Sequence, residues 1–250
     1  MTNKKNIYFA SDVHLGTPNH KESLIREKLF VKWLDEIKHD AKEIYLLGDI
    51  FDFWFEYKHV APRGFTRTLG KIAEITDSGI PVHFFTGNHD LWVFDYLTQE
   101  TGVILHRQKL LTELYGKRFL LAHGDGLGPY DKGYKRMKKV FSNPFAQWLF
   151  ARIHPNFSFC IAHKWSRSSR NSYEVKELKY QGEDKEWLIL YAKQKLKEEH
   201  YNYFIFGHRH VPINIKLSED STFINLGDWL HNFTYAVFDG NKLELKKYTD

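Results

Sequence analysis

The sequence predicts an α/β sandwich in which a helical insert emerges between two strands of the core. In the first half, strand-like apolar runs alternate with amphipathic stretches, and this β-α-β-α-β order is typical of a layered α/β sheet. A long helical segment follows, and the strand pattern returns near the end of the chain. Polar residues that can bind a metal recur directly after five of the predicted strands, which indicates one site at the edge where these strands end.

The first part of the chain has the clearest periodicity. Apolar residues recur at helical spacing over Glu22–His39, and Ser78-Gly79 closes a second helix that covers Thr66–Asp77. The strands expected here are Asn6–Ser11, Glu43–Leu47 and Pro81–Phe85, and a short helix is expected over Leu91–Thr101.

The remainder of the chain contains the insert and the closing strands. Two strands come first, Lys109–Leu114 and Arg118–Ala122. Helical stretches follow at Tyr130–Phe141, Pro144–Ile153, Phe157–Trp165 and Glu183–Glu199. The closing strands are Tyr203–Phe206, Pro212–Leu217, Thr222–Leu226, Phe233–Phe238 and Lys242–Tyr248. We therefore expect a core formed by residues 1–125 and 201–250, with residues 126–200 as the helical insert.

The composition indicates a folded protein of the cell interior. Of 250 residues, 42% are hydrophobic and 16% aromatic, which supports a packed core and excludes global disorder. The single cysteine, Cys160, excludes an internal disulfide and fits a reducing compartment. No apolar run reaches transmembrane length, and the apolar part of the N-terminus is too short for a signal peptide. We expect a soluble, intracellular protein.

Positive charge is concentrated in the insert. The net charge is +5, yet residues 132–170 carry nine Lys or Arg and no Asp or Glu, so the rest of the chain is net negative. A solvated helical face usually includes some acidic residues, and their absence favours an anionic partner. The same stretch contains eight aromatic residues, namely Tyr134, Phe141, Phe145, Trp148, Phe150, Phe157, Phe159 and Trp165.

Seven potential metal ligands follow the predicted strands: Asp12, His14, Asp49, Asn88, His123, His208 and His210. Each local cluster has another reading, because Gly-Asp and Gly-Asn-His-Asp also form turns and helix caps. Five such clusters occupy equivalent positions after strands. Turns and helix caps alone would explain them only as five separate coincidences. The donors are oxygen and nitrogen without thiolate, which suits Mn²⁺, Fe²⁺ or Zn²⁺. Seven ligands are too many for one ion and suit two.

The motifs DVHLG, GDIFD, GNHD, HGD and GHRH, in this order, resemble those of the calcineurin-like metallophosphoesterases. The resemblance covers about residues 6–125 and 203–240, and it implies a four-layer α/β/β/α sandwich with a two-metal site. It implies that one ion is held by Asp12, His14, Asp49 and His210. It implies that the other is held by Asp49, Asn88, His123 and His208, with Asp49 bridging. A hydroxide activated by the two ions would then attack phosphorus.

The resemblance also separates the roles within the GNHD tetrad. In this family the Asn is a ligand, whereas the adjacent residue, His89 here, faces the substrate. His89 is therefore the expected catalytic residue, which stabilises charge on the phosphoryl oxygens or protonates the leaving group. Asp52, Asp90 and Asp125 are expected to orient the ligating imidazoles, with helix caps or surface carboxylates as the alternative.

A second resemblance concerns the substrate. GDIFDFW, the D-x-G-Y after HGD and the Ile-Ala…Ser pattern near Ile161 resemble the bacterial UDP-2,3-diacylglucosamine pyrophosphohydrolases of lipid A biosynthesis. It implies cleavage at the α-phosphate, which yields UMP and 2,3-diacylglucosamine 1-phosphate. The residues expected to contact this substrate are Asn88, Asp131, Tyr134, Arg167, Ser169, Arg170 and Lys176. The chain departs from the pattern at His89, where the best-known members have arginine.

These observations lead to one main hypothesis and two alternatives. The main hypothesis is a Mn²⁺-dependent pyrophosphatase that acts on an amphiphilic nucleotide-sugar lipid. Its basic, aromatic insert would contact the anionic inner face of the bacterial inner membrane, so that the protein is cytoplasmic and peripherally associated. One alternative is another calcineurin-like phosphodiesterase or phosphatase that acts on nucleotides. The other is a nuclease-like or nucleic-acid-binding protein that uses the insert.

Overall fold

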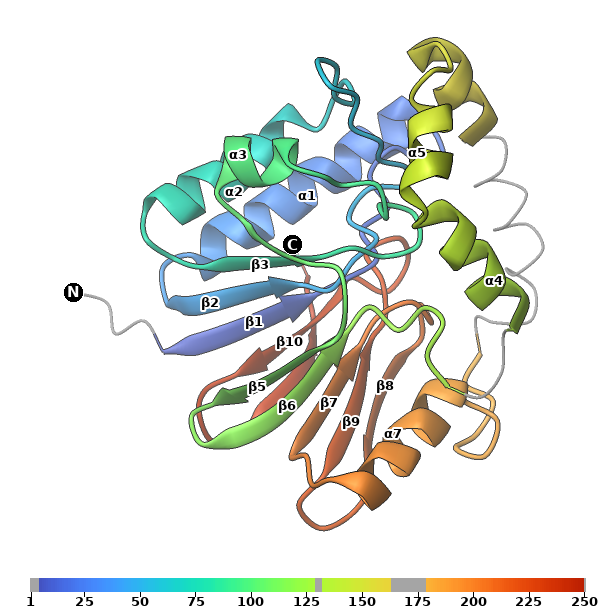
Figure 1. Ribbon diagram of the computed structural model, residues 1–250. Coiled ribbons are helices and arrows are strands. Elements are labelled where there is room, and N and C mark those ends of the chain that lie inside the picture. Colours follow the sequence, from blue (N-terminus) through green and yellow to red (C-terminus); the bar gives the residue numbers. More distant parts are fainter. Residues whose placement is uncertain (1–4, 129–131, 163–178, 250) are drawn as a thin grey trace.

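Two β-sheets face each other, and helices cover the outer face of each (Figure 1). The computed structural model describes residues 5–128, 132–162 and 179–249. In order from the outside, the layers are helices, a six-stranded sheet, a five-stranded sheet and a helix. The predicted α/β/β/α sandwich is therefore confirmed.

The six-stranded sheet has the order β11-β10-β1-β2-β3-β4. Its strands are β1 (Asn6–Ala10), β2 (Ala41–Leu46), β3 (Val82–Phe85), β4 (Ile104–His106), β10 (Thr234–Phe238) and β11 (Leu243–Lys247). Strands β1 to β4 are parallel, whereas β10 pairs antiparallel with both β1 and β11. The outer face is covered by α1 (His20–Ile37), α2 (Thr66–Asp77) and α3 (Tyr96–Thr101). Asn19 caps α1 because its side chain accepts a hydrogen bond from the backbone N–H of Glu22.

The five-stranded sheet has the order β5-β6-β7-β9-β8. Its strands are β5 (Leu110–Leu114), β6 (Lys117–Ala122), β7 (Tyr203–Phe206), β8 (Pro212–Lys216) and β9 (Thr222–Leu226). Strands β6, β7 and β9 are parallel. Helix α7 (Trp187–Glu198) packs its apolar residues, such as Leu188 and Ile189, against this sheet. This helix lies within the stretch 126–200 that we expected to form the insert.

Alternating side chains of β1 face the two sides of the first sheet. Ile7 and Phe9 are buried between the sheets, where they join a cluster that includes Phe119 of β6. Tyr8 and Ala10 face the helical layer together with Trp33 of α1. This period of two is what a strand buried on both faces requires, and it explains the continuous apolar run NIYFA.

Helices α4 (Lys132–Phe141) and α5 (Pro144–Phe150), with a further helix at residues 155–162, form the described part of the insert. They pack on two core loops through aromatic rings. Trp92 lies 5.4 Å from the ring of Phe141 and 4.7 Å from that of Phe150, and its indole N–H donates to the Phe141 carbonyl oxygen. Phe53 contacts Phe159 at 5.0 Å between ring centroids.

Six aromatic residues of the insert helices therefore fall into two groups. Phe141, Phe150 and Phe159 pack against the core. Phe145, Trp148 and Phe157 are exposed, and the apolar residues Val140, Leu149 and Ile161 are exposed beside them. No helix in the described part of the chain combines the length and apolar character needed to cross a bilayer.

Most expected elements are present, but the structure differs in several places. The helices expected over Pro144–Ile153 and Glu183–Glu199 are shorter, Pro144–Phe150 and Trp187–Glu198. The helix expected over Leu91–Thr101 begins only at Tyr96, because the buried carboxylate of Glu56 accepts the backbone N–H groups of Phe94, Asp95 and Tyr96. The three-residue strand β4 was not predicted. Trp165, the expected end of the third insert helix, lies outside the described residues.

Candidate active site

Five loops that follow parallel strands converge at one edge of the two sheets (Figure 1). The loops after β1, β2 and β3 come from the first sheet, and those after β6 and β7 come from the second. They bring the seven expected metal ligands together, in positions that follow the carboxyl ends of the strands.

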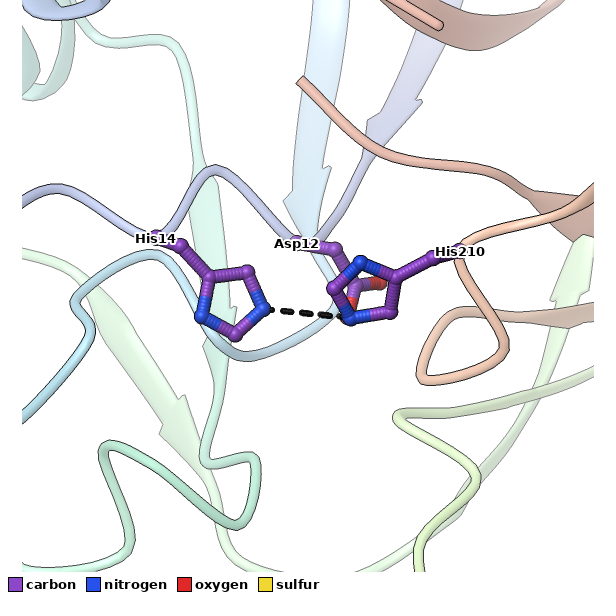
Figure 2. A group of neighbouring side chains, drawn as sticks. All are labelled: Asp12, His14 and His210. Carbon is purple, nitrogen blue, oxygen red and sulfur yellow. Dashed lines mark hydrogen bonds and ion pairs between the residues drawn. The ribbon is translucent and has the colours of Figure 1, made fainter. Parts of the chain in front are cut away.

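The first group of ligands consists of Asp12, His14 and His210 (Figure 2). The Nε2 atoms of the two imidazoles face each other at 3.2 Å. The Oδ1 atom of Asp12 lies 3.3 Å from Nε2 of His210 and 3.8 Å from Nε2 of His14. Three donor atoms, from loops of both sheets, thus lie close enough together to hold one ion.

The second group consists of Asp49, His123 and His208. Nε2 of His123 lies 3.2 Å from Oδ2 of Asp49 and 3.2 Å from Oδ1 of Asn88. The same Oδ2 atom of Asp49 lies 3.8 Å from Nε2 of His14 in the first group. Asp49 therefore stands between the two groups.

The donor atoms fit two divalent cations. Oδ1 of Asp12 is buried and has no hydrogen-bond partner, which is costly unless a cation is bound there. Nδ1 of His123 lies 2.8 Å from the Leu47 carbonyl oxygen, and that contact requires the proton on Nδ1. Once a cation replaces the proton on Nε2 of His123, the lone pair of that atom would face Asp49 and Asn88, as metal ligation requires.

The charges of the site also suit cations. Burial opposes a charge on Asp12, but His210 and His14 outweigh this effect and hold its pKa at about 2. Burial opposes the imidazolium forms of His14 and His123 as well, yet neighbouring carboxylates raise the pKa of each to about 10. In the metal-free protein these two rings therefore carry protons that a cation would replace.

Five of the ligands have backbone conformations that side chains rarely adopt. The φ angles are 56° at Asp12, 47° at His14, 54° at Asp49, 68° at His208 and 54° at His210. Non-glycine residues with positive φ are uncommon, and they cluster at functional sites because the surrounding structure must hold them there. The backbone strain is thus located at the expected metal ligands.

Two glycines let the loops approach closely enough for this geometry. A Cβ atom at Gly87 would lie 2.2 Å from Oδ1 of Asp49. A Cβ atom at Gly207 would lie 2.5 Å from Oδ2 of Asp12. Any side chain at either position would displace a carboxylate of the site.

Comparisons with known proteins agree with this geometry. The family model described as calcineurin-like phosphoesterase matches residues 5–212. The chain belongs to this family. The chain is 41% identical, over 99% of both chains, to the UDP-2,3-diacylglucosamine hydrolase of Porphyromonas gingivalis. It is 29% identical to the protein of the same name from Vibrio vulnificus, over 96% of this chain and 97% of the relative. Among solved structures, a dimetal phosphatase from Danio rerio is similar at a TM-score of 0.49 and 14% identity, over 98% of this chain and 96% of that one.

Membership of the phosphoesterase family and the His/Asp clusters together indicate a two-metal site. The identity of the metal and the role of each ligand stay predictions.

The three carboxylates expected to orient imidazoles have different contacts in this phosphoesterase. Oδ1 of Asp52 lies 3.5 Å from Nδ1 of His14, and its role in orienting that imidazole stays a prediction. The hydrogen bonds of Asp90 instead go to backbone N–H groups, those of Gly87 and of residues 49–51. Asp90 thus joins the GNHD turn to the GDIF turn. The hydrogen bonds of Asp125 go to the insert, where Lys138 donates at 2.6 Å.

His89 lies beside the first group of ligands. Its ring is 4.8 Å from that of His14, and its Nδ1 donates to the backbone carbonyl of Asp52 at 2.9 Å. One ring nitrogen of His89 lies close enough to donor atoms of His14 and Asp49 for the three residues to hold one ion. The side chain is 14% exposed, so it can reach both the solvent and the metal groups. Burial lowers the pKa of His89.

Asp228 is a residue of the site that the sequence reasoning missed. Its Oδ2 accepts from Nδ1 of His210 at 3.3 Å, which leaves Nε2 of His210 directed at the first group. A signal was present, because Gly227-Asp228 follows a strand in the same way as Gly48-Asp49 does. Arg26 was missed as well. This buried side chain donates to the backbone carbonyl oxygens of Val13 and His14, and no sequence signal marks it.

Among the expected substrate contacts, Asn88 and Tyr134 can be placed. Asn88 lies with the second group, as above. The Tyr134 hydroxyl donates to Oδ2 of Asp125 at 2.5 Å, and its ring lies 6.5 Å from that of His208. The other expected contacts, Asp131, Arg167, Ser169, Arg170 and Lys176, lie outside the described residues.

Proposed function

We propose that this phosphoesterase hydrolyses the pyrophosphate bond of UDP-2,3-diacylglucosamine and releases UMP and 2,3-diacylglucosamine 1-phosphate for lipid A biosynthesis. The observation that carries the proposal is the 41% identity, over 99% of both chains, to the hydrolase of that name from Porphyromonas gingivalis. The converged ligand set supports it, because two cations bound there would serve a phosphoryl substrate.

The cofactor we propose is a pair of Mn²⁺ ions. Asp12, His14 and His210 would hold one ion, Asn88, His123 and His208 would hold the other, and Asp49 would join the two. Mixed carboxylate, amide and imidazole donors suit Mn²⁺, while Fe²⁺ and Zn²⁺ share much of this preference. The ions would lower the pKa of water and neutralise charge on the phosphoryl oxygens.

His89 would act on the substrate rather than on a metal. Its Nδ1–H is engaged by the Asp52 carbonyl, and Nε2 is the ring nitrogen that would face a phosphoryl oxygen. Burial lowers the pKa of His89, which leaves the free imidazole neutral. An anionic pyrophosphate beside the ring would favour protonation of Nε2, and the resulting N–H could stabilise the developing charge or protonate the leaving group.

The insert would serve the lipid part of the reaction. Phe145 and Trp148 of α5, stacked at 5.9 Å, are exposed together with Phe157 of the neighbouring helix. Arg152 covers the Trp148 ring at 4.7 Å, so a cation stands beside this apolar surface. Apolar side chains flanked by cations suit acyl chains and an anionic bilayer surface. We therefore place the protein at the cytoplasmic face of the bacterial inner membrane.

The substrate is tested by product analysis. Protein dialysed against a chelator and supplied with Mn²⁺ should release UMP from the diacylated UDP-sugar. In ¹⁸O-water the label should appear in UMP, as attack at the α-phosphate requires. UDP-N-acetylglucosamine, which carries one acetyl group in place of the two long acyl chains, is the matched control and should react poorly. Efficient cleavage of nucleotides or simple diesters without release of UMP from the lipid would contradict the proposal, as would salt-sensitive cleavage of RNA or DNA.

Membrane contact is tested by flotation with vesicles that contain anionic phospholipid. Exchange of Phe145, Trp148 and Phe157 for serine should abolish flotation. The matched control exchanges three apolar residues that are exposed elsewhere, Ile25, Ile104 and Leu111, for serine. Equal loss in both variants, or flotation that persists in the first, would count against the insert as the contact surface.

A further inference from the structure

A buried ion pair lies directly behind the turn that carries two of the ligands. Arg209, between His208 and His210, donates from Nε to Oε2 of Glu186 at 2.8 Å and from Nη2 to Oε1 at 2.9 Å. The two side chains are only 1% and 2% exposed. The chain positions are far apart, since Glu186 precedes α7 and Arg209 follows β7.

Stability alone does not explain this pair. Two charges removed from water lose their hydration, and the attraction between them seldom exceeds that loss by much. Replacement of such pairs by apolar residues of similar size is often neutral or stabilising. A buried pair is better explained by the arrangement that it enforces than by the stability that it adds.

The arrangement joins the insert to the metal ligands. Oε1 of Glu186 also accepts a hydrogen bond from the backbone N–H of Gln181. The carboxylate therefore also binds the segment in which the chain returns from the insert. Trp187, the next residue, lies under the Arg209 guanidinium at 4.9 Å and has its ring 6.3 Å from that of His208. A Cβ atom at Gly128, where the insert begins, would lie 3.0 Å from the Trp187 carbonyl oxygen. Gly128 and Gln181, which flank the described helices α4, α5 and 155–162 of the insert, thus both lie near this turn.

The turn itself needs external support. His208 and His210 both have positive φ, and Arg209 donates its backbone N–H to the Gly207 carbonyl oxygen at 2.8 Å. The two imidazoles project toward different groups, His208 toward Asp49 and His210 toward Asp12. A small rotation of this turn would therefore move a ligand of each group at once.

We propose that Glu186 and Arg209 are positioning residues, which fix His208 and His210 relative to both metal groups and couple that placement to the insert. The inference rests on the two-metal part of the proposed function and not on the identity of the lipid substrate. The planar guanidinium of Arg209 contributes its geometry as well as its charge. Its two parallel hydrogen bonds to Glu186 define the orientation of the turn.

The test uses the double variant Glu186→Gln/Arg209→Met in the full-length protein, with Arg209→Lys beside it. The double variant removes both charges, so it leaves no unpaired ion and should fold. Mn²⁺ binding is measured by electron paramagnetic resonance on chelator-treated protein, and kcat is measured on a chromogenic diester. We expect at least about tenfold weaker Mn²⁺ binding and a lower kcat with native circular dichroism, as for other residues that support metal ligands. The Mn²⁺ affinity and kcat of Arg209→Lys should lie between those of wild type and those of the double variant.

The control is Ile75→Ala in α2, a buried residue of the opposite helical layer. It should lower the melting temperature and leave Mn²⁺ binding unchanged. A folded double variant whose Mn²⁺ affinity and kcat equal those of wild type would overturn the inference, as would an equal loss of Mn²⁺ affinity in Ile75→Ala. A wild-type protein that binds no Mn²⁺ would instead overturn the two-metal proposal itself.

Discussion

Substitution of Trp92 by alanine should release the insert from the core. The Trp92 ring contacts Phe53, Phe55, Phe141 and Phe150 at centroid distances from 4.7 to 6.1 Å. Its N–H also satisfies the Phe141 carbonyl oxygen at the end of α4. Trp92 thus joins the GNHD loop to the GDIFDF loop and to the insert helices α4 and α5.

The magnitude follows from these contacts. Truncation of a buried Trp to Ala costs about 3–5 kcal/mol, and the partial exposure of Trp92 favours the lower end. For a chain of this length each kcal/mol corresponds to about 2–4 °C, so the melting temperature should fall by about 6–12 °C. Amide hydrogen exchange in residues 132–162 should accelerate more than exchange in the strands of the core.

Trp148→Ala is the matched control, because Trp148 is a tryptophan of the insert helix α5 but is 50% exposed. It should change the free energy of unfolding by no more than about 0.5 kcal/mol, as surface substitutions do. Thermal denaturation followed by circular dichroism measures both variants. If Trp92→Ala melts within about 2 °C of wild type and the insert exchanges at its normal rate, then the aromatic cluster does not hold the insert and the reasoning fails.

Three further predictions concern the metal groups. His210→Ala should lower the bound metal, counted by plasma mass spectrometry, by one ion per chain and abolish Mn²⁺-dependent turnover; full activity would contradict the two-metal site. Carboxylates raise the pKa of His14 and His123 to about 10. Mn²⁺ should therefore displace protons from the metal-free protein at pH 7.5 and bind more weakly as the pH falls. Calorimetry in buffers of different ionisation enthalpy counts the protons released, and a count of zero would refute the assignment. His89→Ala should keep both ions and lower kcat by about 10²–10⁴-fold, whereas loss of an ion would make His89 a ligand.

The layers of the fold and the position of the site could be predicted because both depend on local signals. The run NIYFA has a strand period, and Asp12 and His14 follow it directly, so the ligands could be assigned to a strand end without knowledge of the tertiary structure. The same logic reached Asp49 and His123 and overlooked Asp228, where the Gly-Asp signal was also present. The sequence therefore contains the signal for Asp228 as well.

Other features depend on contacts between distant parts of the chain. The start of α3 is set by Glu56, which lies 40 residues before Tyr96, so a helix pattern alone placed the boundary too early. The periodicity of the insert could not tell Phe150, which packs on Phe55, from Trp148, which is exposed, because both belong to one short helix. Arg209 and Glu186 are 23 residues apart, and only the fold brings them together.

The placement of the ligands explains why a sandwich of two sheets suits this chemistry. In the first group, Asp12 and His14 come from the six-stranded sheet and His210 comes from the five-stranded sheet. In the second, Asp49 comes from the first sheet and His123 from the other. Neither sheet alone supplies a complete group, so the distance between two cations would be set by the packing of large, rigid layers. The strained backbone of the ligands is then held by the core, and the loops remain free to carry the residues that contact substrate.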